Sequence, residues 1–170
     1  VIRMSLLDDE IKIWENETVV CMQNKSLQYL QFKKLLEYPE LKHCYTLKND
    51  GKLNFPPIYK DENTYKQSCQ KICDCLEIDL KQARIVKPHQ THTNKVKNVN
   101  QVETLEEIDG VITNKKDLVL LTTSADCISL LLYDPVKKVI GSIHSGWKGT
   151  LKQICVNSIK NMIQYYNSKP

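Results

Sequence analysis

Four strand-like runs of apolar residues follow one another in the second half of the chain, and they constrain its fold more than any other feature. Polar turns separate the runs, including a turn at Asp134-Pro135. The second and third runs are the most apolar, which is typical of strands in a sheet that is covered on both faces. In chain order the runs are Ile108–Thr113, Leu118–Thr123, Ile128–Tyr133 and Lys138–His144.

Apolar residues at helical spacing predict three amphipathic helices outside this region. Asp61 or Asn63 is placed to cap the second of them. Helices near both ends with strands between them indicate an α/β (α+β) fold. At 170 residues and 41% hydrophobic the chain can build a sizeable core, so we expect one domain over residues 1–170. The helices are expected over Lys25–Leu41, Asp61–Leu76 and Gly149–Tyr166, and further strands over residues 11–22 (a hairpin), His43–Leu47 and Ala83–Lys87.

Composition and charge exclude several classes of function. The net charge is +4, but arginine occurs only at Arg3 and Arg84 and no basic run is interleaved with aromatics, so we expect no nucleic-acid partner. No apolar stretch reaches the ~18 residues that would span a membrane. Val1–Met4 lack the apolar region of a secretory signal, and an odd set of seven cysteines favours free thiols over disulfides. The cytoplasm is therefore the expected compartment.

The densest chemical signal lies between Thr122 and Gly149. A thiol and a carboxylate, Cys127 and Asp126, stand between two apolar runs, and His144 ends the next run. If the runs on either side of Asp134-Pro135 pair as an antiparallel hairpin, Cys127 and His144 lie at the same edge of the sheet. Their spacing is thus compatible with shared binding of a metal ion.

A third candidate ligand, His92, follows the strand expected over Ala83–Lys87. One thiolate and two imidazoles form a borderline-soft set that suits Zn²⁺. Three protein ligands would leave a fourth position open, as catalytic zinc sites do. Gly146 and Gly149 permit close backbone approach and precede a helix, whose first N–H groups favour an anion.

Each of these residues also has a plainer interpretation. A cysteine between buried strands is usually a small apolar core residue, and a loop histidine is usually solvated. For Trp147 alone, packing is favoured over stacking on a substrate. Cys69, Cys73 and Cys75 are spaced like metal ligands, but they also fit the apolar stripe of their helix, so core packing is favoured there.

Several ordered motifs resemble those of the YfiH-like family, over about residues 43–170. Members of this family have been labelled polyphenol oxidases (laccases) and also zinc-dependent purine nucleoside phosphorylases with adenosine deaminase activity. The resemblance is carried by Ser124-Ala125-Asp126-Cys127, His144-Ser145-Gly146-Trp147-Lys148-Gly149, Ile108–Thr113, Gln90-Thr91-His92 with Val96, and more faintly His43–Lys48 and Leu53-Asn54.

The resemblance implies a layered α/β/β/α sandwich with mixed sheets and zinc ligands at His92, Cys127 and His144. With such a site, Lys48, Gly146, Trp147 and Lys148 are candidates to bind substrate or phosphate. Asp126 or Asp109 would orient a ligand or carry a proton, although a structural role that closes the strand turns suits both residues at least as well. Lysine stands at positions 48 and 148 where the family usually has arginine, so the charge is kept but the bidentate fork is lost. Family members continue beyond the helix that closes this chain, so the domain is expected to be incomplete at its C-terminus.

The resulting hypothesis is a zinc enzyme that acts on a purine nucleoside and phosphate, by phosphorolysis or by deamination of adenosine. Its first rival is a copper-dependent polyphenol oxidase. One thiolate and two imidazoles also bind copper, but multicopper chemistry needs more histidines than the four in this chain. The second rival is a metal-stabilised domain without activity. The sequence leaves the oligomeric state open.

Overall fold

The computed structural model describes residues 10–25, 27–57 and 60–170. Val1–Met4, on which the expectation of no secretory signal depends, lie outside these residues. The chain packs as two compact units, Val1–Leu80 and Lys81–Pro170, which are described one at a time. The expectation of one domain over residues 1–170 stays a prediction.

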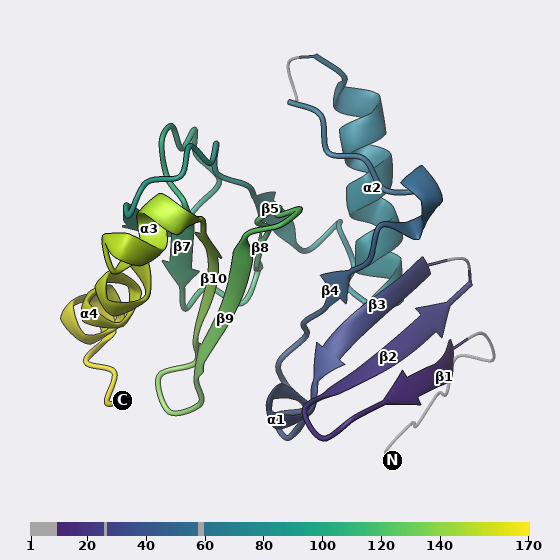
Figure 1. Ribbon diagram of the computed structural model, residues 1–170, viewed down its shortest axis with the longest axis horizontal. Helices are drawn as coiled ribbons and strands as arrows, with labels where there is room; N and C mark the ends of the chain where they lie inside the picture. Colours follow the sequence, from purple (N-terminus) through teal and green to yellow (C-terminus); the bar gives the residue numbers. More distant parts are fainter. Residues whose placement is uncertain (1–9, 26, 58–59) are drawn as a thin grey trace. The chain divides into compact units, whose positions relative to one another are not determined.

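The first unit contains a four-stranded antiparallel sheet in the order β1-β2-β3-β4 (Figure 1). The predicted hairpin is confirmed, and its turn is held by Asn16, whose Oδ1 accepts from the N–H groups of Thr18 and Val19 at 2.9 and 2.8 Å. The elements of this unit are β1 Glu10–Glu15, β2 Val19–Asn24, β3 Leu27–Phe32, α1 Lys33–Leu36, β4 Tyr45–Thr46, a 3-10 turn Asn49–Gly51 and α2 Glu62–Cys75.

The predicted helix over Lys25–Leu41 is wrong. Residues Leu27–Phe32 of that segment form β3, and only the single turn of α1, Lys33–Leu36, follows it. Leu27 and Tyr29 alternate into the core, and β3 has a hydrogen-bonded neighbour on each side. Pairing on both edges, together with burial of Tyr29 at 1% exposure, outweighs the helical spacing of the leucines.

The helix predicted over Asp61–Leu76 is confirmed as α2, and Asp61 caps it by accepting from the N–H of Thr64 at 2.9 Å. Core packing is confirmed for two of the clustered cysteines, because Cys69 and Cys73 are buried. Burial raises the pKa of the Cys73 thiol to about 11, with Cys69 and Asp74 adding to the shift. A buried cysteine in apolar surroundings is chemically inert, which agrees with a role in core packing.

The second unit is built on a mixed sheet in the order β6-β7-β10-β9, beside a parallel pair of strands, β5 and β8. The α/β (α+β) prediction with mixed sheets is thereby confirmed. Among the described residues, no helix has the length and apolar character needed to cross a bilayer. The elements are β5 Arg84–Val86, β6 Val96–Asn98, β7 Gly110–Thr113, β8 Leu118–Leu120, β9 Ile128–Asp134, β10 Val139–Ser145, α3 Trp147–Leu151 and α4 Ile154–Tyr166.

The mixed sheet has a core on each face. Val111 and Ile112 are neighbours on β7 and therefore point to opposite faces. Val111 packs with residues of β5 and β8, including Val86 and Leu118. Ile112 packs with Ile143 of β10 and with α4, which lies along the sheet in Figure 1.

The closing helix differs from its prediction. The expected helix over Gly149–Tyr166 is two helices, because Gln153 takes a left-handed conformation (φ 58°) that interrupts the helical backbone. The first of them, α3, begins at Trp147, two residues before the predicted start. Asn167, also left-handed, ends α4.

Candidate metal centre

The hairpin of β9 and β10 places two of the three candidate ligands. Ser145 pairs with Ile128 and His144 with Ser129, so Cys127 stands directly before the first paired residue of β9. Cys127 and His144 therefore lie at the same end of the hairpin, as the turn at Asp134-Pro135 predicts. His92 comes from the loop between β5 and β6.

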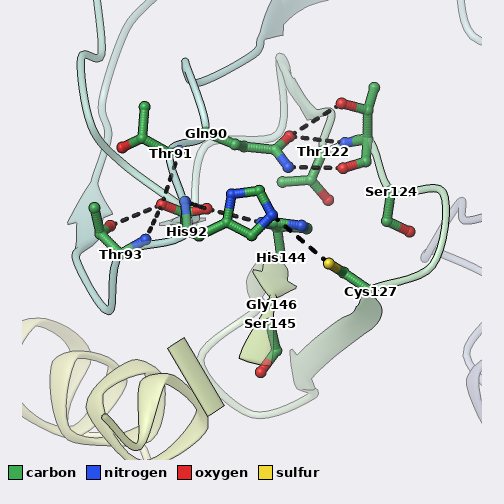
Figure 2. A network of polar contacts seen from close by, with 12 residues as sticks. Gln90, Thr91, His92, Thr93, Thr122, Ser124, Cys127, His144, Ser145 and Gly146 are labelled. Carbon is green, nitrogen blue, oxygen red and sulfur yellow. Dashed lines mark hydrogen bonds and ion pairs between the residues drawn. The ribbon is translucent and has the colours of Figure 1, made fainter. Parts of the chain in front are cut away.

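The structure brings the side chains of His92, Cys127 and His144 together (Figure 2). One ligand atom from each lies within 4.8 Å of the others, and His92 Nε2 is 3.8 Å from Cys127 Sγ. The two imidazole rings meet edge to face, with centroids 4.9 Å apart. Within the described residues this is the only such group of three or more His, Cys, Asp or Glu side chains.

The donor set and its spacing fit zinc. Zn–S and Zn–N bonds of tetrahedral sites imply a sulfur-to-nitrogen separation of about 3.6 Å, close to the observed 3.8 Å. His144 is buried, Cys127 is partly exposed and His92 is exposed, so the group is open to solvent on one side. A site with three protein donors and an open side suits a catalytic ion better than a structural one.

Asp109 connects the two histidines. Its carboxylate is fully buried and accepts from His144 Nδ1 at 2.7 Å and from the N–H of His92 at 3.0 Å. It also accepts from the N–H groups of Thr91 and Thr93, at 3.2 and 2.7 Å, and from the Thr93 hydroxyl at 2.7 Å. His92 takes the left-handed region (φ 62°), and the three successive N–H groups converge on one anion, as in a backbone nest.

Asp109 also sets the tautomer of His144. Burial raises the pKa of this carboxyl, but the hydrogen bonds from His144 and Thr93 outweigh burial, and the pKa is lowered overall. An ionised carboxylate only accepts, so Nδ1 of His144 carries the proton. The lone pair of Nε2 is thereby left for a metal ion, as in the carboxylate–histidine pairs of zinc sites.

The Cys127 thiol lies near a second carboxylate. Partial desolvation raises its pKa, and the negative charge of Asp126, whose Oδ1 is 3.7 Å from the sulfur, raises it further. A metal ion must displace that proton, since thiolate is the binding form. Asp126 is exposed and contacts neither histidine among the hydrogen bonds of the described residues, so its predicted catalytic role stays a prediction.

Three further predicted residues, Trp147, Lys148 and Lys48, are outside the group of candidate ligands. Trp147 begins α3 and is 67% exposed, and the ammonium of Lys148 lies 5.5 Å from the centre of its ring. Lys48 belongs to the first unit. Their roles in binding substrate or phosphate stay predictions. The sequence did not indicate Thr93, which bonds to the Asp109 carboxylate, or Thr123, which bonds to the Gln90 amide. No local sequence pattern predicts either bond.

Gly146 is required by the close approach of His92. A Cβ added to Gly146 would lie 2.5 Å from Cδ2 of His92 and 3.5 Å from the Cys127 sulfur. Its backbone (φ −67°, ψ 167°) suits any residue, so a substitution there tests the clash alone. The absence of a side chain at position 146 thus makes room for the ligand ring.

We expect Gly146→Ala to displace the His92 ring and to weaken zinc binding about 10- to 100-fold, as misplaced ligands do. The urea midpoint of the metal-free protein should change little. Zinc affinity is measured by competition with a chromogenic chelator. A variant that binds zinc as tightly as the wild type would show that His92 is not a ligand.

Residues 51–170 match the family described as multi-copper polyphenol oxidoreductase laccase. The chain belongs to this family. It is 36% identical over 121 residues to purine nucleoside phosphorylase YlmD of Bacillus subtilis, covering 65% of this chain and 42% of that protein. It is 42% identical over 77 residues to purine nucleoside phosphorylase RP494 of Rickettsia prowazekii, covering 45% of this chain and 32% of that protein.

Two solved structures share the fold. The hypothetical protein YfiH of Bacillus licheniformis superposes with a TM-score of 0.62 at 22% identity, over 91% of this chain and 59% of that one. YlmD of Geobacillus stearothermophilus superposes with a TM-score of 0.56 at 16% identity, over 92% and 59%. The chain spans less than half the length of the two curated relatives that it matches.

Proposed function

We propose that this chain binds one Zn²⁺ at His92, Cys127 and His144 and acts on a purine nucleoside with phosphate as second substrate. The observation that carries the proposal is the prearranged His–Cys–His group, with His144 already held in the metal-binding tautomer by Asp109. Relatives at 36% and 42% identity bear the name purine nucleoside phosphorylase, which supports this choice of substrate class.

Zinc in this setting would supply a Lewis acid that polarises a substrate or activates water. The chain's own residues do the positioning. Asp109 keeps the proton on Nδ1 of His144, and the exposed indole of Trp147 offers an apolar face near the site. Lys148 is the proposed phosphate contact of this unit. Asp126 is the proposed proton carrier because it is exposed beside Cys127.

Phosphorolysis breaks the bond between C1′ of the ribose and N9 of the purine and forms a bond from C1′ to a phosphate oxygen. The leaving base takes up a proton. Deamination of adenosine is the alternative reaction at the same site. Water then replaces the amino group, which leaves as ammonia. Copper oxidation of phenols is disfavoured, because the chain has four histidines and only one metal-binding group among its described residues.

We place this activity in the cytoplasm. All seven cysteines are free thiols, which suits a reducing compartment. The buried position of Cys69 and Cys73 accounts for two of these thiols without invoking a metal or a disulfide.

The test is turnover of inosine and adenosine by the zinc-loaded chain, with and without phosphate. We expect free base and ribose 1-phosphate in equal amounts, and only when phosphate is present. Ammonia released from adenosine without phosphate would assign deamination instead. Metal analysis of chain expressed with both zinc and copper available identifies the bound ion. A zinc-loaded chain that releases neither base nor ammonia would refute the proposed activity of this chain.

A further inference from the structure

The side-chain amide of Gln90 is bonded on both of its polar ends to the backbone of one residue, Thr123. Gln90 Nε2 donates to the Thr123 carbonyl at 2.7 Å, and the Thr123 N–H donates to Gln90 Oε1 at 2.8 Å (Figure 2). The Thr123 hydroxyl reaches the same Oε1 at 3.3 Å. Gln90 lies two residues before His92, and Thr123 lies four residues before Cys127.

This amide continues a strand ladder that the backbone itself cannot continue. β5 and β8 pair in parallel up to Val86 opposite Leu120, and the N–H of Leu121 then donates to the Val86 carbonyl. Two residues beyond Val86 the chain reaches Pro88, which has no N–H to donate the next bond of the ladder. The Gln90 amide carries one carbonyl and a donor N–H, like a peptide group, and it supplies the next pair of bonds from a side chain.

The bond pair also completes the connections among the three ligand segments. Asp109 joins His92 to His144, and the β9–β10 ladder joins Cys127 to His144. Among the bonds of the described residues, Gln90 connects the backbone of the irregular segment 121–127 to the His92 segment, beside the contact of the Cys127 sulfur with the His92 ring itself. The same segment is also bonded to Val86 through the N–H of Leu121 and to Ser142 of β10 through the Thr122 hydroxyl.

We propose that Gln90 is a positioning residue, which holds the Cys127 segment against the His92 loop so that thiolate and imidazole meet the same metal ion. This inference rests on the proposed metal site and adds a residue that touches neither the metal nor the substrate. Its effect is on sulfur ligation, because the two histidines are connected separately by Asp109.

The first measurement uses cobalt in place of zinc, since a cobalt–thiolate bond has its own charge-transfer band in the near ultraviolet. We compare wild type with Gln90→Ala and with Gln90→Glu, which keeps the size and the acceptor but sets a carboxylate against the Thr123 carbonyl. Both variants should lose most of the band and about 10- to 100-fold in cobalt affinity. Gln31→Ala is the matched control, because Gln31 Nε2 also donates to a backbone carbonyl, that of His43 at 3.1 Å, in the other unit. That variant should keep both the band and the affinity.

The second measurement needs no metal. Loss of the Gln90 acceptor should speed hydrogen exchange of the Thr123 amide about fivefold, the equivalent of one hydrogen bond. Far-ultraviolet circular dichroism verifies that each variant is folded, and Gln90→Glu remains informative if Gln90→Ala is not. An unchanged cobalt–thiolate band in a folded Gln90 variant would overturn the inference while leaving the metal site intact. A wild-type chain that binds no cobalt or zinc would instead refute the metal site, and this inference with it.

Discussion

Cys127→Ala is expected to abolish stoichiometric zinc binding and nucleoside turnover together. The thiol of Cys127 is one of three donors in the group, and the other two are imidazoles. Loss of an outer hydrogen-bond partner alone costs a zinc site about 10- to 100-fold in affinity, so loss of a direct ligand should exceed about 100-fold. The fold should persist, because Cys127 is only partly buried and belongs to neither hydrophobic cluster of its unit.

Cys155→Ala is the matched control for that experiment. Cys155 lies on α4 in the same unit, is exposed, and is a free thiol like Cys127. It is outside the metal-binding group. Zinc per chain is measured by plasma mass spectrometry after dialysis, and turnover is measured with inosine and phosphate. Equal zinc content in wild type and Cys127→Ala would remove Cys127 from the site, whatever the activity of the two proteins.

Asp109→Asn is expected to have the second-largest effect, on both stability and metal binding. The buried carboxylate accepts five hydrogen bonds, and an amide of the same size replaces one acceptor oxygen with a donor. At least one buried donor then faces another donor. We expect the free energy of unfolding to fall by roughly 2–4 kcal/mol and zinc affinity to fall about 10- to 100-fold.

Asp126→Asn is the matched control for Asp109→Asn, because it makes the same chemical change at an exposed carboxylate. It removes a negative charge beside the Cys127 thiol, but Asp126 is exposed and is not among the hydrogen-bond partners of Asp109 in the described residues. Its stability in urea should therefore match that of the wild type. Denaturation curves of the metal-free variants give the stability change, and chelator competition gives the affinity. If Asp109→Asn were as stable as Asp126→Asn, the buried carboxylate would not be holding the two histidine segments together.

The choice of ligands could be predicted from sequence to a useful extent. Cys127 and His144 flank two apolar runs joined through Asp134-Pro135, and antiparallel pairing of such runs brings their outer ends together. His92 was predicted from its position after the strand expected over Ala83–Lys87. The family resemblance supported it, because no local pattern relates a loop histidine to a distant hairpin. The structure agrees with all three as neighbours, at distances that suit one ion.

Two helix predictions show where local patterns were insufficient. The leucines of Lys25–Leu41 repeat at helical spacing, yet Leu27–Phe32 form the strand β3, because β2 and β4 pair with its two edges. The break at Gln153 depends on a left-handed residue that is not glycine or asparagine, and such a position carries no compositional signal.

By itself the sequence determined the chemistry available to this protein: one thiol and two imidazoles, two of them at the same end of a hairpin whose geometry follows from strand periodicity and one turn. Only the tertiary structure decided how these donors are held. The anchoring roles of Asp109 and Gln90 arise from bonds across 16 to 35 residues of chain. Bonds of that span depend on how the strands pack rather than on local preference, because a buried carboxylate or amide takes whichever donors the packed backbone presents to it.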